Sequence, residues 1–487
     1  MSERATHHRH RRLRLRARRA ALVPVVCAVA LATTVSCTAE AGTHPVGGIG
    51  GIGHSPAADS PAPDGARRLT GRLADGATWV ADVPAHWKGT LLLFSHGLGA
   101  LKAKDARNAE TRALLLKRGY AMVGSSYDPH GSPWALRSAE RDQLAALDAF
   151  SAASHRAPRR TLAVGESMGG LVTARIAQDG AGHGISGAVD FCGAVAGGPV
   201  LGDYQLNGAY AAARLLLPDG GRPPLQGFGS DAAARRAGAV LDRAVGAAQS
   251  TAAGRARTAL VASLLNLPGW TSGQAPPAAD DYAGQEAQQA ESFTRAHGRF
   301  AAVQGIRRSL EQSAGGAVSG NTGVDYSRLE AGSPQRAEVA ALYRKAGLDL
   351  AKDLADLTRH ADQKPDPAAA RSLRSTSSPG SKLSVPLLDV HTEADPVIAA
   401  QQETPFGTRM AQAGDAALLR QAYVHRAGHL NILPAEQVAA IDAVNHRVAT
   451  GSWSRAGTAA LQKAAKAVDP KAAFHPFGPG ALVVAPG

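Results

Sequence analysis

The chain has 487 residues, of which 44% are hydrophobic, 19% charged and 5% aromatic, and it contains 54 glycines and 28 prolines. This composition is typical of a glycine-rich globular protein and excludes a fibrous or a wholly disordered chain. The formal net charge is +13 at pH 7. A charge of this size is common in nucleic-acid-binding proteins, so its distribution along the chain has to be considered.

Positive charge is concentrated at the beginning of the chain. Residues 1–41 contain eight arginines and two glutamates, so six of the thirteen net charges belong to this segment. The later sequence has no run of Lys or Arg with interleaved aromatic residues, which is the pattern that nucleic-acid binding favours. We therefore expect no nucleic-acid partner.

The first 41 residues have the pattern of an export signal. A basic stretch that ends at Arg19 precedes an uncharged apolar run over residues 21–35, which is too short to span a membrane comfortably. Cleavage after Ala41 would follow the small-x-small rule, whereas Cys37 ends a sequence that resembles a lipobox and would be acylated. Paired arginines leave twin-arginine export open as a route. We expect a protein that is secreted, or held at the cell surface by a lipid on Cys37.

Composition and hydrophobic periodicity divide the rest of the chain into five segments. A linker rich in Gly, Pro, Ala and Ser, which cannot bury enough apolar surface to fold, precedes a core in two parts. A long helical insertion separates these parts, and a tail follows them. The segments are the linker 42–67, the first part of the core 68–198, the insertion 199–380, the second part of the core 381–451 and the tail 452–487.

Strands and helices alternate in the first part of the core. An Asp-Gly pair at residues 75–76 predicts a hairpin turn, and the apolar run 90–95 is typical of a strand that is buried on both faces of a parallel sheet. The expected strands are residues 69–73, 78–83, 90–95, 120–125, 161–164 and 187–195, and the expected helices are residues 108–118, 138–154 and 171–178. This alternation predicts a doubly wound, mostly parallel α/β sheet.

The insertion interrupts the alternation, because its Ala-rich segments have helical spacing only. We expect helices at residues 232–247, 260–265, 287–310 and 334–357. The sheet then resumes, with strands at residues 383–390 and 418–425 and helices at residues 399–412 and 434–448. The predicted fold class is therefore α/β, with a large α-helical cap inserted into a mostly parallel sheet.

A serine turn is predicted at Gly165-Glu166-Ser167-Met168-Gly169. A G-x-S-x-G match is weak by itself in a chain with 54 glycines. Here it lies between an expected strand and an expected helix, which is the setting that a nucleophile elbow requires. Glycines at both ends let the strand and the helix approach closely and expose the serine hydroxyl above the sheet. Ser167 is therefore the candidate nucleophile.

An activated serine needs donors for the oxyanion that forms during acyl transfer. The strand 90–95 continues into a Gly-rich loop, residues 95–99. Such a loop directs a backbone N–H at the oxyanion, and the N–H of the residue after the nucleophile is its partner. We predict that the N–H groups of Leu98 and Met168 form this oxyanion hole.

The acid is expected after the strand 383–390. Asp395 is favoured, because it lies in a loop that leads through Pro396 into a helix, where a carboxylate turns toward an imidazole. Glu393 is the runner-up, and Asp389 lies within the strand. A capping role for Asp395 at the following helix is the structural alternative.

The base is expected after the next strand, residues 418–425. His429 is favoured, because it follows an Ala-Gly pair in a loop that reaches over the sheet. His425 belongs to the strand itself, and we expect it to be structural.

The three candidates occur in the chain order serine, aspartate, histidine, which is the order of an α/β-hydrolase triad. His96-Gly97, the serine turn, Asp395 and Gly428-His429 together resemble the α/β-hydrolase superfamily. The resemblance covers residues 68–198 and 381–451, and residues 83–97 are similar to the opening of secreted bacterial esterases and amidases.

The resemblance implies an exported serine hydrolase that cleaves carboxylic esters through an acyl-enzyme. Amide or peptide bonds are the alternative substrates, and a non-catalytic binding protein is a further hypothesis. The serine at the elbow separates the chain from haloalkane dehalogenases and epoxide hydrolases of this fold, which use aspartate there. We expect no cofactor and no metal, because the sequence has no closed cluster of Cys and His.

The insertion is expected to cover the serine turn and to select an acyl substrate, either small or oligomeric. Tyr204 and Trp270 are candidates for lining its pocket. Aromatic residues in such a segment are more often part of a hydrophobic core, which is the alternative for both.

Overall fold

The computed structural model describes residues 58–61, 65–295 and 298–485. They belong to the second of two compact units into which the chain divides, residues 52–487. The expected export signal, with Cys37 and Ala41, lies outside the described residues.

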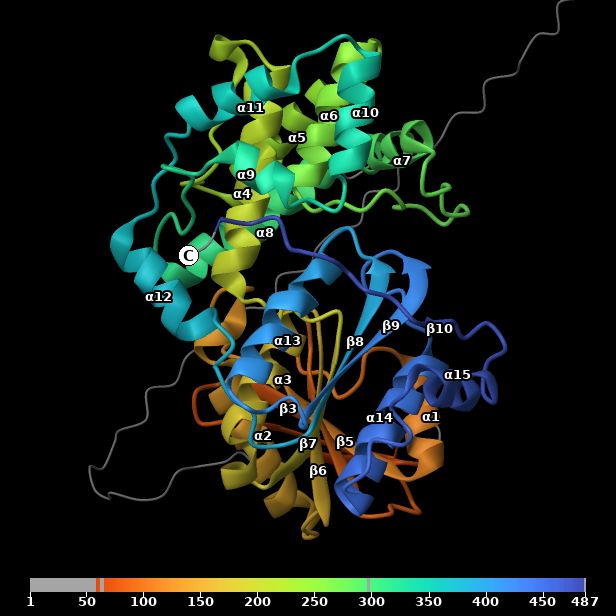
Figure 1. Ribbon diagram of the computed structural model, residues 1–487. Helices are drawn as coiled ribbons and strands as arrows, with labels where there is room; N and C mark the ends of the chain where they lie inside the picture. The colour runs from red at the N-terminus through yellow and green to blue at the C-terminus, as the bar shows by residue number, and fades with distance from the viewer. Residues whose placement is uncertain (1–57, 62–64, 296–297, 486–487) are drawn as a thin grey trace, which may run out of the picture. The chain divides into compact units, whose positions relative to one another are not determined.

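Strands of the described residues form a single ten-stranded sheet (Figure 1). They are β1 Ala58–Pro61, β2 Arg67–Arg72, β3 Thr78–Val83, β4 Thr90–Ser95, β5 Tyr120–Ser125, β6 Arg160–Glu166, β7 Ile185–Phe191, β8 Leu387–Ala394, β9 Leu419–Ala427 and β10 Phe474–His475. Their order is β1-β2-β3-β5-β4-β6-β7-β8-β9-β10. The six central strands, β5, β4, β6, β7, β8 and β9, run parallel to one another. On the outer sides of this group, β1, β2, β3 and β10 pair antiparallel with their neighbours. The predicted mostly parallel sheet is confirmed.

Helices cover both faces of this sheet (Figure 1). One face carries α1 Ala109–Arg118, α14 Pro434–Thr450 and α15 Thr458–Lys466, and the other carries α2 Ala139–Ser154, α3 Met168–Asp179 and α13 Glu403–Gln412. Alternate side chains of β4 enter the two hydrophobic cores, Leu91 and Leu93 on one side and Leu92 and Phe94 on the other. The continuous apolar runs of the central strands arise because both of their faces are buried.

The chain between β7 and β8 forms a helical cap. Its helices are α4 Gly198–Leu216, α5 Asp231–Ala248, α6 Ala252–Leu264, α7 Tyr282–Thr294, α8 Arg299–Ala314, α9 Tyr326–Ala331, α10 Arg336–Lys345, α11 Leu350–Arg359 and α12 Pro367–Ser377. Short 3-10 helices lie at Ala135–Arg137, Gly180–His183, Asp219–Gly221 and Ala400–Gln402. The cap is joined to the core by hydrogen bonds from Ser132 Oγ to the carbonyl of Ser309 and from Trp134 Nε1 to Ser377 Oγ, both 2.9 Å.

Two of the expected cap helices are each divided in two. The segment 287–310 breaks at Gly298, which has a φ of +60°. The carboxylate of Asp242, in α5, accepts the N–H groups of Phe300 and Ala301 at 2.8 and 3.0 Å and so caps the start of α8. The segment 334–357 breaks between α10 and α11, where Gly347 has a φ of +66° and the neighbouring Asp349 caps α11 by accepting the N–H of Lys352 at 3.1 Å. Helical spacing alone does not reveal a cap that a distant residue supplies.

The strands also differ from the prediction in places, and β7 ends at Phe191 rather than at residue 195. β1 lies inside the expected linker 42–67 and pairs with β2 from Ala58↔Thr70 to Pro61↔Arg67. Pairing through backbone groups requires no apolar side chains, so composition did not indicate it. β8 begins at Leu387 rather than at residue 383, since Pro386 has no N–H for the sheet, and it extends to Ala394.

The tail after residue 451 contains α15 and β10 and then returns toward the cap (Figure 1). The carbonyl of Gly480 accepts the hydroxyl of Thr404 in α13 at 2.7 Å. Further on, the backbone of Val483 exchanges two hydrogen bonds with the side chain of Asn266, at 2.8 and 2.9 Å. The tail therefore fastens the cap as well as the sheet.

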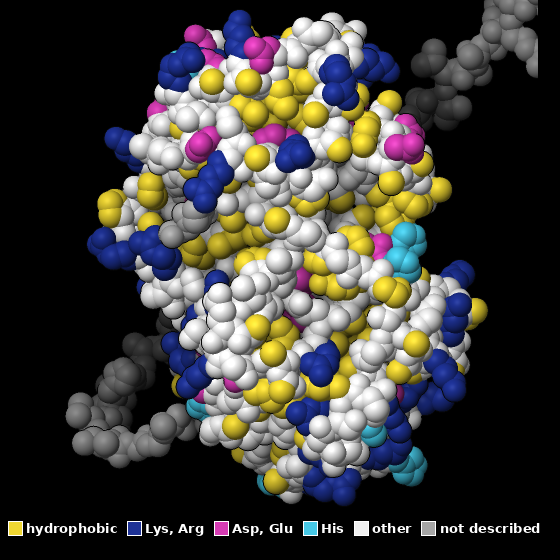
Figure 2. All heavy atoms as spheres, viewed as in Figure 1, with side chains coloured by type: hydrophobic (Ala, Val, Ile, Leu, Met, Phe, Trp, Pro, Cys, Tyr) yellow, Lys and Arg dark blue, Asp and Glu magenta, His cyan; other side chains and the backbone are white. Residues whose placement is uncertain are grey.

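On the face drawn in Figure 2, Lys and Arg side chains are distributed over the surface and interspersed with acidic ones. Within the described residues, no helix combines the length and the apolar character that crossing a membrane requires.

Candidate active site

The serine turn joins β6 to α3 in a strained backbone conformation. Ser167 has φ 57° and ψ −121°, a region that residues with a side chain rarely occupy. Its N–H donates to the carbonyl of Phe191 at the end of β7, at 3.0 Å. A Cβ atom on Gly169 would overlap the carbonyl oxygens of Ser95 and His96. Glycine is therefore required there for α3 to approach the end of β4.

Residues from three distant parts of the sequence meet at this turn. His429, in the loop after β9, has its Nε2 atom 2.9 Å from the Oγ of Ser167. Its Nδ1 atom lies 2.6 Å from Oδ2 of Asp395, directly after β8. Ser167 is partly exposed, the side chain of His429 is 17% exposed, and that of Asp395 is fully buried. The structure thus brings together the three residues that the sequence predicts as nucleophile, base and acid.

Backbone donors orient the carboxylate of Asp395. Its Oδ1 atom accepts the N–H groups of Val397 and Ile398 at 2.7 and 3.0 Å, which leaves Oδ2 directed at His429. Burial raises the pKa of Asp395, but the neighbouring imidazoles of His429 and His391 outweigh burial and hold the pKa well below its usual value. Asp395 does not cap the following helix, which was the alternative weighed from the sequence, because that helix begins only at Ala400. Its Oδ1 atom holds the turn before the helix, and its Oδ2 atom holds the imidazole.

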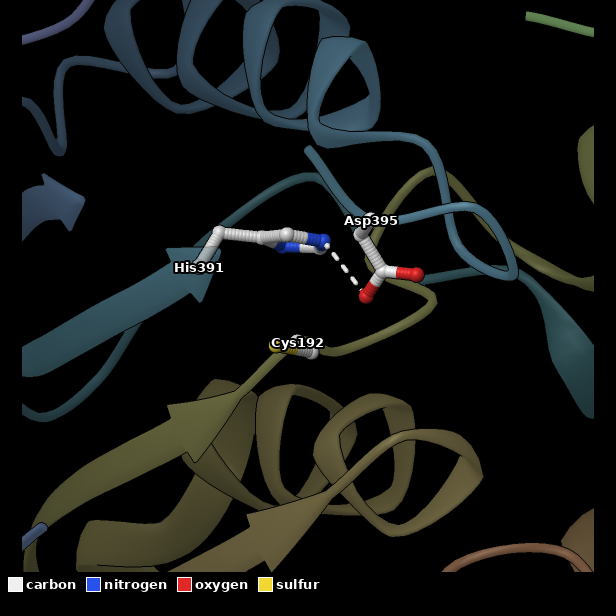
Figure 3. A group of neighbouring side chains, drawn as sticks. All are labelled: Cys192, His391 and Asp395. Carbon is white, nitrogen blue, oxygen red and sulfur yellow. Dashed lines mark ion pairs between the residues drawn. The ribbon is translucent and has the colours of Figure 1, made fainter. Parts of the chain in front are cut away.

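His391 lies behind Asp395 (Figure 3), and the sequence did not suggest it. Its Nε2 atom is 3.5 Å from Oδ2 of Asp395 and 3.0 Å from the carbonyl of Ile398, and its Nδ1 atom is 2.7 Å from Oε1 of Glu403. Burial lowers the pKa of His391, but the hydrogen bond and the charge of Asp395 raise it by more, so the pKa lies above its usual value. Both ring nitrogens face oxygen acceptors, which favours the imidazolium form.

Cys192 lies beside His391 and Asp395 in Figure 3 but is not an activated thiol. Its side chain is buried, with Sγ 3.7 Å from the hydroxyl of Thr392, and burial raises the pKa of the thiol. A buried thiol with a raised pKa is a packing residue rather than a nucleophile.

The loop after β4 passes directly beside the serine. A Cβ atom on Gly97 would lie 3.2 Å from Cβ of Ser167. The loop is held by Tyr127, whose ring stacks on His96 with centroids 4.2 Å apart and whose hydroxyl donates to the carbonyl of His96 at 2.9 Å. The N–H groups of Leu98 and Met168 donate to no carbonyl in the turns and loops of the described residues. Their role as oxyanion donors stays a prediction.

Arg107 connects the serine turn to the loop of His429. Its guanidinium donates to the carbonyls of Leu430 and Ile432, the latter at 3.3 Å, and its Nε atom lies 3.6 Å from Oε2 of Glu166. Burial raises the pKa of Glu166, and Arg107 opposes that rise. The sequence contained one indication of such a partner, the carboxylate of Glu166 in the serine motif, because a buried carboxylate needs a cation nearby.

The other acid and base candidates lie elsewhere. Glu393 contacts His425 at 2.6 Å and His475 at 2.7 Å rather than His429. Asp389 lies within β8, opposite Asp190 of β7.

The two pocket candidates lie in different surroundings. Tyr204, in α4, is buried, and its hydroxyl is 3.3 Å from the carbonyl of Val397, next to the Asp395 turn. Trp270 lies between α6 and α7, where its Nε1 donates to the carbonyl of Gln274 at 2.8 Å and its ring is 5.0 Å from that of His425. Substrate contact by either residue stays a prediction.

No protein-family model matches the chain. It is 28% identical over 416 residues to the o-phthalyl amidase of Xanthobacter agilis, in a match that covers 79% of this chain and 87% of the relative. Among solved structures it is similar to an esterase from Aspergillus oryzae, with 14% identity, a TM-score of 0.38 and 80% of each chain covered. It is also similar to Candida antarctica lipase A in its closed state, with 13% identity, a TM-score of 0.37 and 82% of each chain covered.

The chain's own topology defines its fold. A mostly parallel sheet carries a strained serine after β6, a carboxylate after β8 and a histidine after β9, which is the arrangement of α/β-hydrolases. The match to the amidase extends over most of both chains. The chain therefore has the α/β-hydrolase fold that its sequence predicts, and its match to the amidase supports a hydrolase.

Proposed function

We propose that the chain is an exported serine hydrolase that cleaves carboxylic esters through a covalent acyl-enzyme. The observation that carries this proposal is the continuous hydrogen-bonded series Ser167, His429, Asp395, with distances of 2.9 and 2.6 Å. A serine hydroxyl becomes a useful nucleophile when a base accepts its proton and a third group orients that base.

The proposed reaction has two halves. Oγ of Ser167 bonds to the acyl carbon while its proton passes to Nε2 of His429, and the N–H groups of Leu98 and Met168 donate to the new oxyanion. The bond to the alcohol oxygen then breaks, and this oxygen takes the proton from His429. Water repeats the sequence on the acyl-enzyme and releases the carboxylic acid. These steps consume water and need no cofactor.

Amide hydrolysis is the second candidate, and the 28% identity to an o-phthalyl amidase over most of the chain favours it. The same groups would act, but an amine leaves only when it is protonated, so His429 must donate as the carbon–nitrogen bond breaks. Under either proposal the substrate is an acyl compound, small or oligomeric, that the cap selects beside Ser167.

Export is supported by the basic and apolar pattern of residues 1–41. The mass of the mature protein distinguishes the two processing routes. A chain that starts at Gly42 indicates ordinary cleavage and secretion, whereas a chain that starts at a diacylated Cys37 indicates a lipoprotein at the cell surface.

The test of the proposed function is paired hydrolysis of p-nitrophenyl esters and p-nitroanilides of the same acids. Ser167→Ala should lower turnover by about 1,000-fold or more, while Ser375→Ala, at an exposed serine of α12, should leave it unchanged. Turnover of esters alone supports the first candidate, and turnover of anilides supports the second. Absence of Ser167-dependent turnover on both panels would overturn the proposal.

A further inference from the structure

We propose that Glu393, His425 and His475 form a binding site for a divalent transition-metal ion, with Zn²⁺ as the best-matched ion. We call these three residues the Glu393 site. The Nδ1 atom of His425 lies 2.6 Å from Oε2 of Glu393, and that of His475 lies 2.7 Å from Oε1. One ligand atom from each residue lies within 4.8 Å of the others. The proposal is independent of the hydrolytic function.

The fold assembles this site from three adjacent strands. In the pairing of β8 with β9, the register passes from Thr392↔Val424 to Ala394↔Ala427, so His425 and Arg426 both lie opposite Glu393. Such a bulge redirects side chains at the end of a ladder. β10 then brings His475 alongside, because it pairs with β9 through His475↔Tyr423. Three residues that are far apart in the sequence are thereby held on a common edge of the sheet.

The charge of Glu393 points to a cationic occupant. Its side chain is only 8% exposed, and among the described residues its hydrogen-bond and ion-pair partners are the two histidines alone. A nearly buried carboxylate needs a compensating positive charge. A metal ion bound by the carboxylate and the two imidazoles would supply that charge.

The ligand set and its exposure match zinc. Two imidazole nitrogens and one carboxylate are ligands that Zn²⁺ prefers, and they leave a coordination position for water. The side chains of His425 and His475 are 45% and 53% exposed, so an ion and its water can enter from solvent.

Two buried groups of candidate ligands are less suitable. Both contain His391, one with Cys192 and Asp395 and the other with Asp389 and Glu403. The ring nitrogens of His391 already bond to Glu403 and to the carbonyl of Ile398, at 2.7 and 3.0 Å. An ion there would have to displace the contacts that orient Asp395, whereas at the Glu393 site it would replace only contacts among the ligands.

Occupation of the Glu393 site would join the ends of β8 and β9. Glu393 is two residues before Asp395, and His425 is four residues before His429. A bound ion should therefore raise the melting temperature of the protein by linkage, because it binds the folded arrangement and not the unfolded chain. The ring of Trp270, 5.0 Å from His425, provides a fluorescence reporter for a quenching ion such as Co²⁺.

The test uses the full chain purified without a histidine tag and freed of metal with a chelator. Zn²⁺ is titrated by calorimetry and Co²⁺ by visible absorption and tryptophan quenching, for the wild type, His475→Gln, His425→Gln and the control His183→Gln. His183 is an exposed histidine outside the site. All variants keep the histidines of the N-terminal segment, so differences between them report on the Glu393 site alone.

We expect one Zn²⁺ site in the wild type and in the control. Its affinity for Zn²⁺ should fall by about tenfold or more when either ligand histidine is replaced. Zn²⁺ should also raise the melting temperature of the wild type and of His183→Gln but not of the ligand variants. Identical isotherms for wild type and ligand variants would overturn the proposal. If a ligand variant fails to fold, the wild type still decides the question, since the absence of a Zn²⁺-dependent rise in its melting temperature overturns the site.

Discussion

The Nε atom of Arg107 lies 3.6 Å from Oε2 of Glu166, the residue immediately before Ser167. The same guanidinium bonds the carbonyls of Leu430 and Ile432, which follow His429. One side chain from the segment before α1 thus holds the serine turn and the histidine loop in a fixed relation. Catalysis by a serine and a histidine depends on such positioning, because small displacements of reacting groups lower the rate strongly.

Replacement of Arg107 should therefore affect the rate more than substrate binding. We expect Arg107→Gln to lower kcat by about tenfold or more with a smaller change in KM, because the loop of His429 loses two carbonyl anchors. Steady-state kinetics on an ester substrate would measure this, with Arg235→Gln, at an exposed arginine of α5, as the control. An unchanged kcat in Arg107→Gln would contradict the positioning role.

Gly169→Ala and Gly305→Ala should have opposite effects on stability. The added methyl group at residue 169 would overlap the backbone of Ser95 and His96. We expect the free energy of unfolding to fall by a few kcal/mol and the activity to be lost. At Gly305, inside α8, no atom lies within 4 Å of an added Cβ, and we expect a gain of about 0.5–1 kcal/mol. Denaturant unfolding of both variants measures the difference, and equal effects would contradict the close packing of the serine turn.

Three buried carboxylates in the cap should make its stability depend on pH. Burial raises the pKa of Glu338 to about 8, and those of Glu286 and Glu330 to about 7. Between pH 4.5 and 8 the unfolded chain releases the proton of Glu338 while the folded chain retains it, so stability falls as the pH rises. Arg336, which opposes the shift at Glu330, and the hydrogen bond from Gln289 to Glu338 reduce the effect without reversing it.

Glu338→Gln should remove part of this penalty. We expect the variant to be more stable than the wild type by about 1 kcal/mol or more at pH 8.5 and equally stable at pH 4.5. Thermal unfolding at the two pH values is the measurement, and Glu110→Gln, at an exposed residue of α1, is the control. A gain of the same size at both pH values would contradict the pKa-based explanation.

Asp395→Asn should separate the two functions of this side chain. Asparagine keeps an oxygen for the N–H groups of Val397 and Ile398, so the variant should fold, although the loss of the charge beside two imidazoles should lower its melting temperature. Its NH₂ group would have to donate to Nδ1 of His429, which places the proton on Nε2 and prevents that atom from accepting the proton of Ser167. We expect kcat to fall by a factor on the order of 1,000 to 10,000. Retention of more than a tenth of the wild-type kcat would argue against Asp395 as the acid.

The sheet could be predicted because its physical signals are local. Strands such as β4 and β5 are buried on both faces and therefore read as continuous apolar runs. Ser167 could be singled out for the same reason, since its glycine neighbours reflect a strained turn between a strand and a helix. Asp395 and His429 followed from their positions after the last two long strands.

The supporting contacts could not be predicted, because they join residues that are distant in the sequence. Arg107 bonds a carbonyl 325 residues away, and Asp242 caps a helix that begins 57 residues later, at Arg299. His391 lies just after the predicted strand 383–390, and its partner Glu403 lies in α13. His475 joins Glu393 only because the tail adds β10 to the edge of the sheet. These contacts depend on the folded topology and leave no periodic pattern.

The central claim is that Ser167 is a nucleophile activated by His429. Its most direct test is labelling of the full chain with a fluorophosphonate, followed by mass spectrometry of the modified peptide. We predict one label per chain, on Ser167, with no labelling of Ser167→Ala and strongly slowed labelling of His429→Ala. Absence of labelling in the folded wild type, or a label on another serine, would contradict the account.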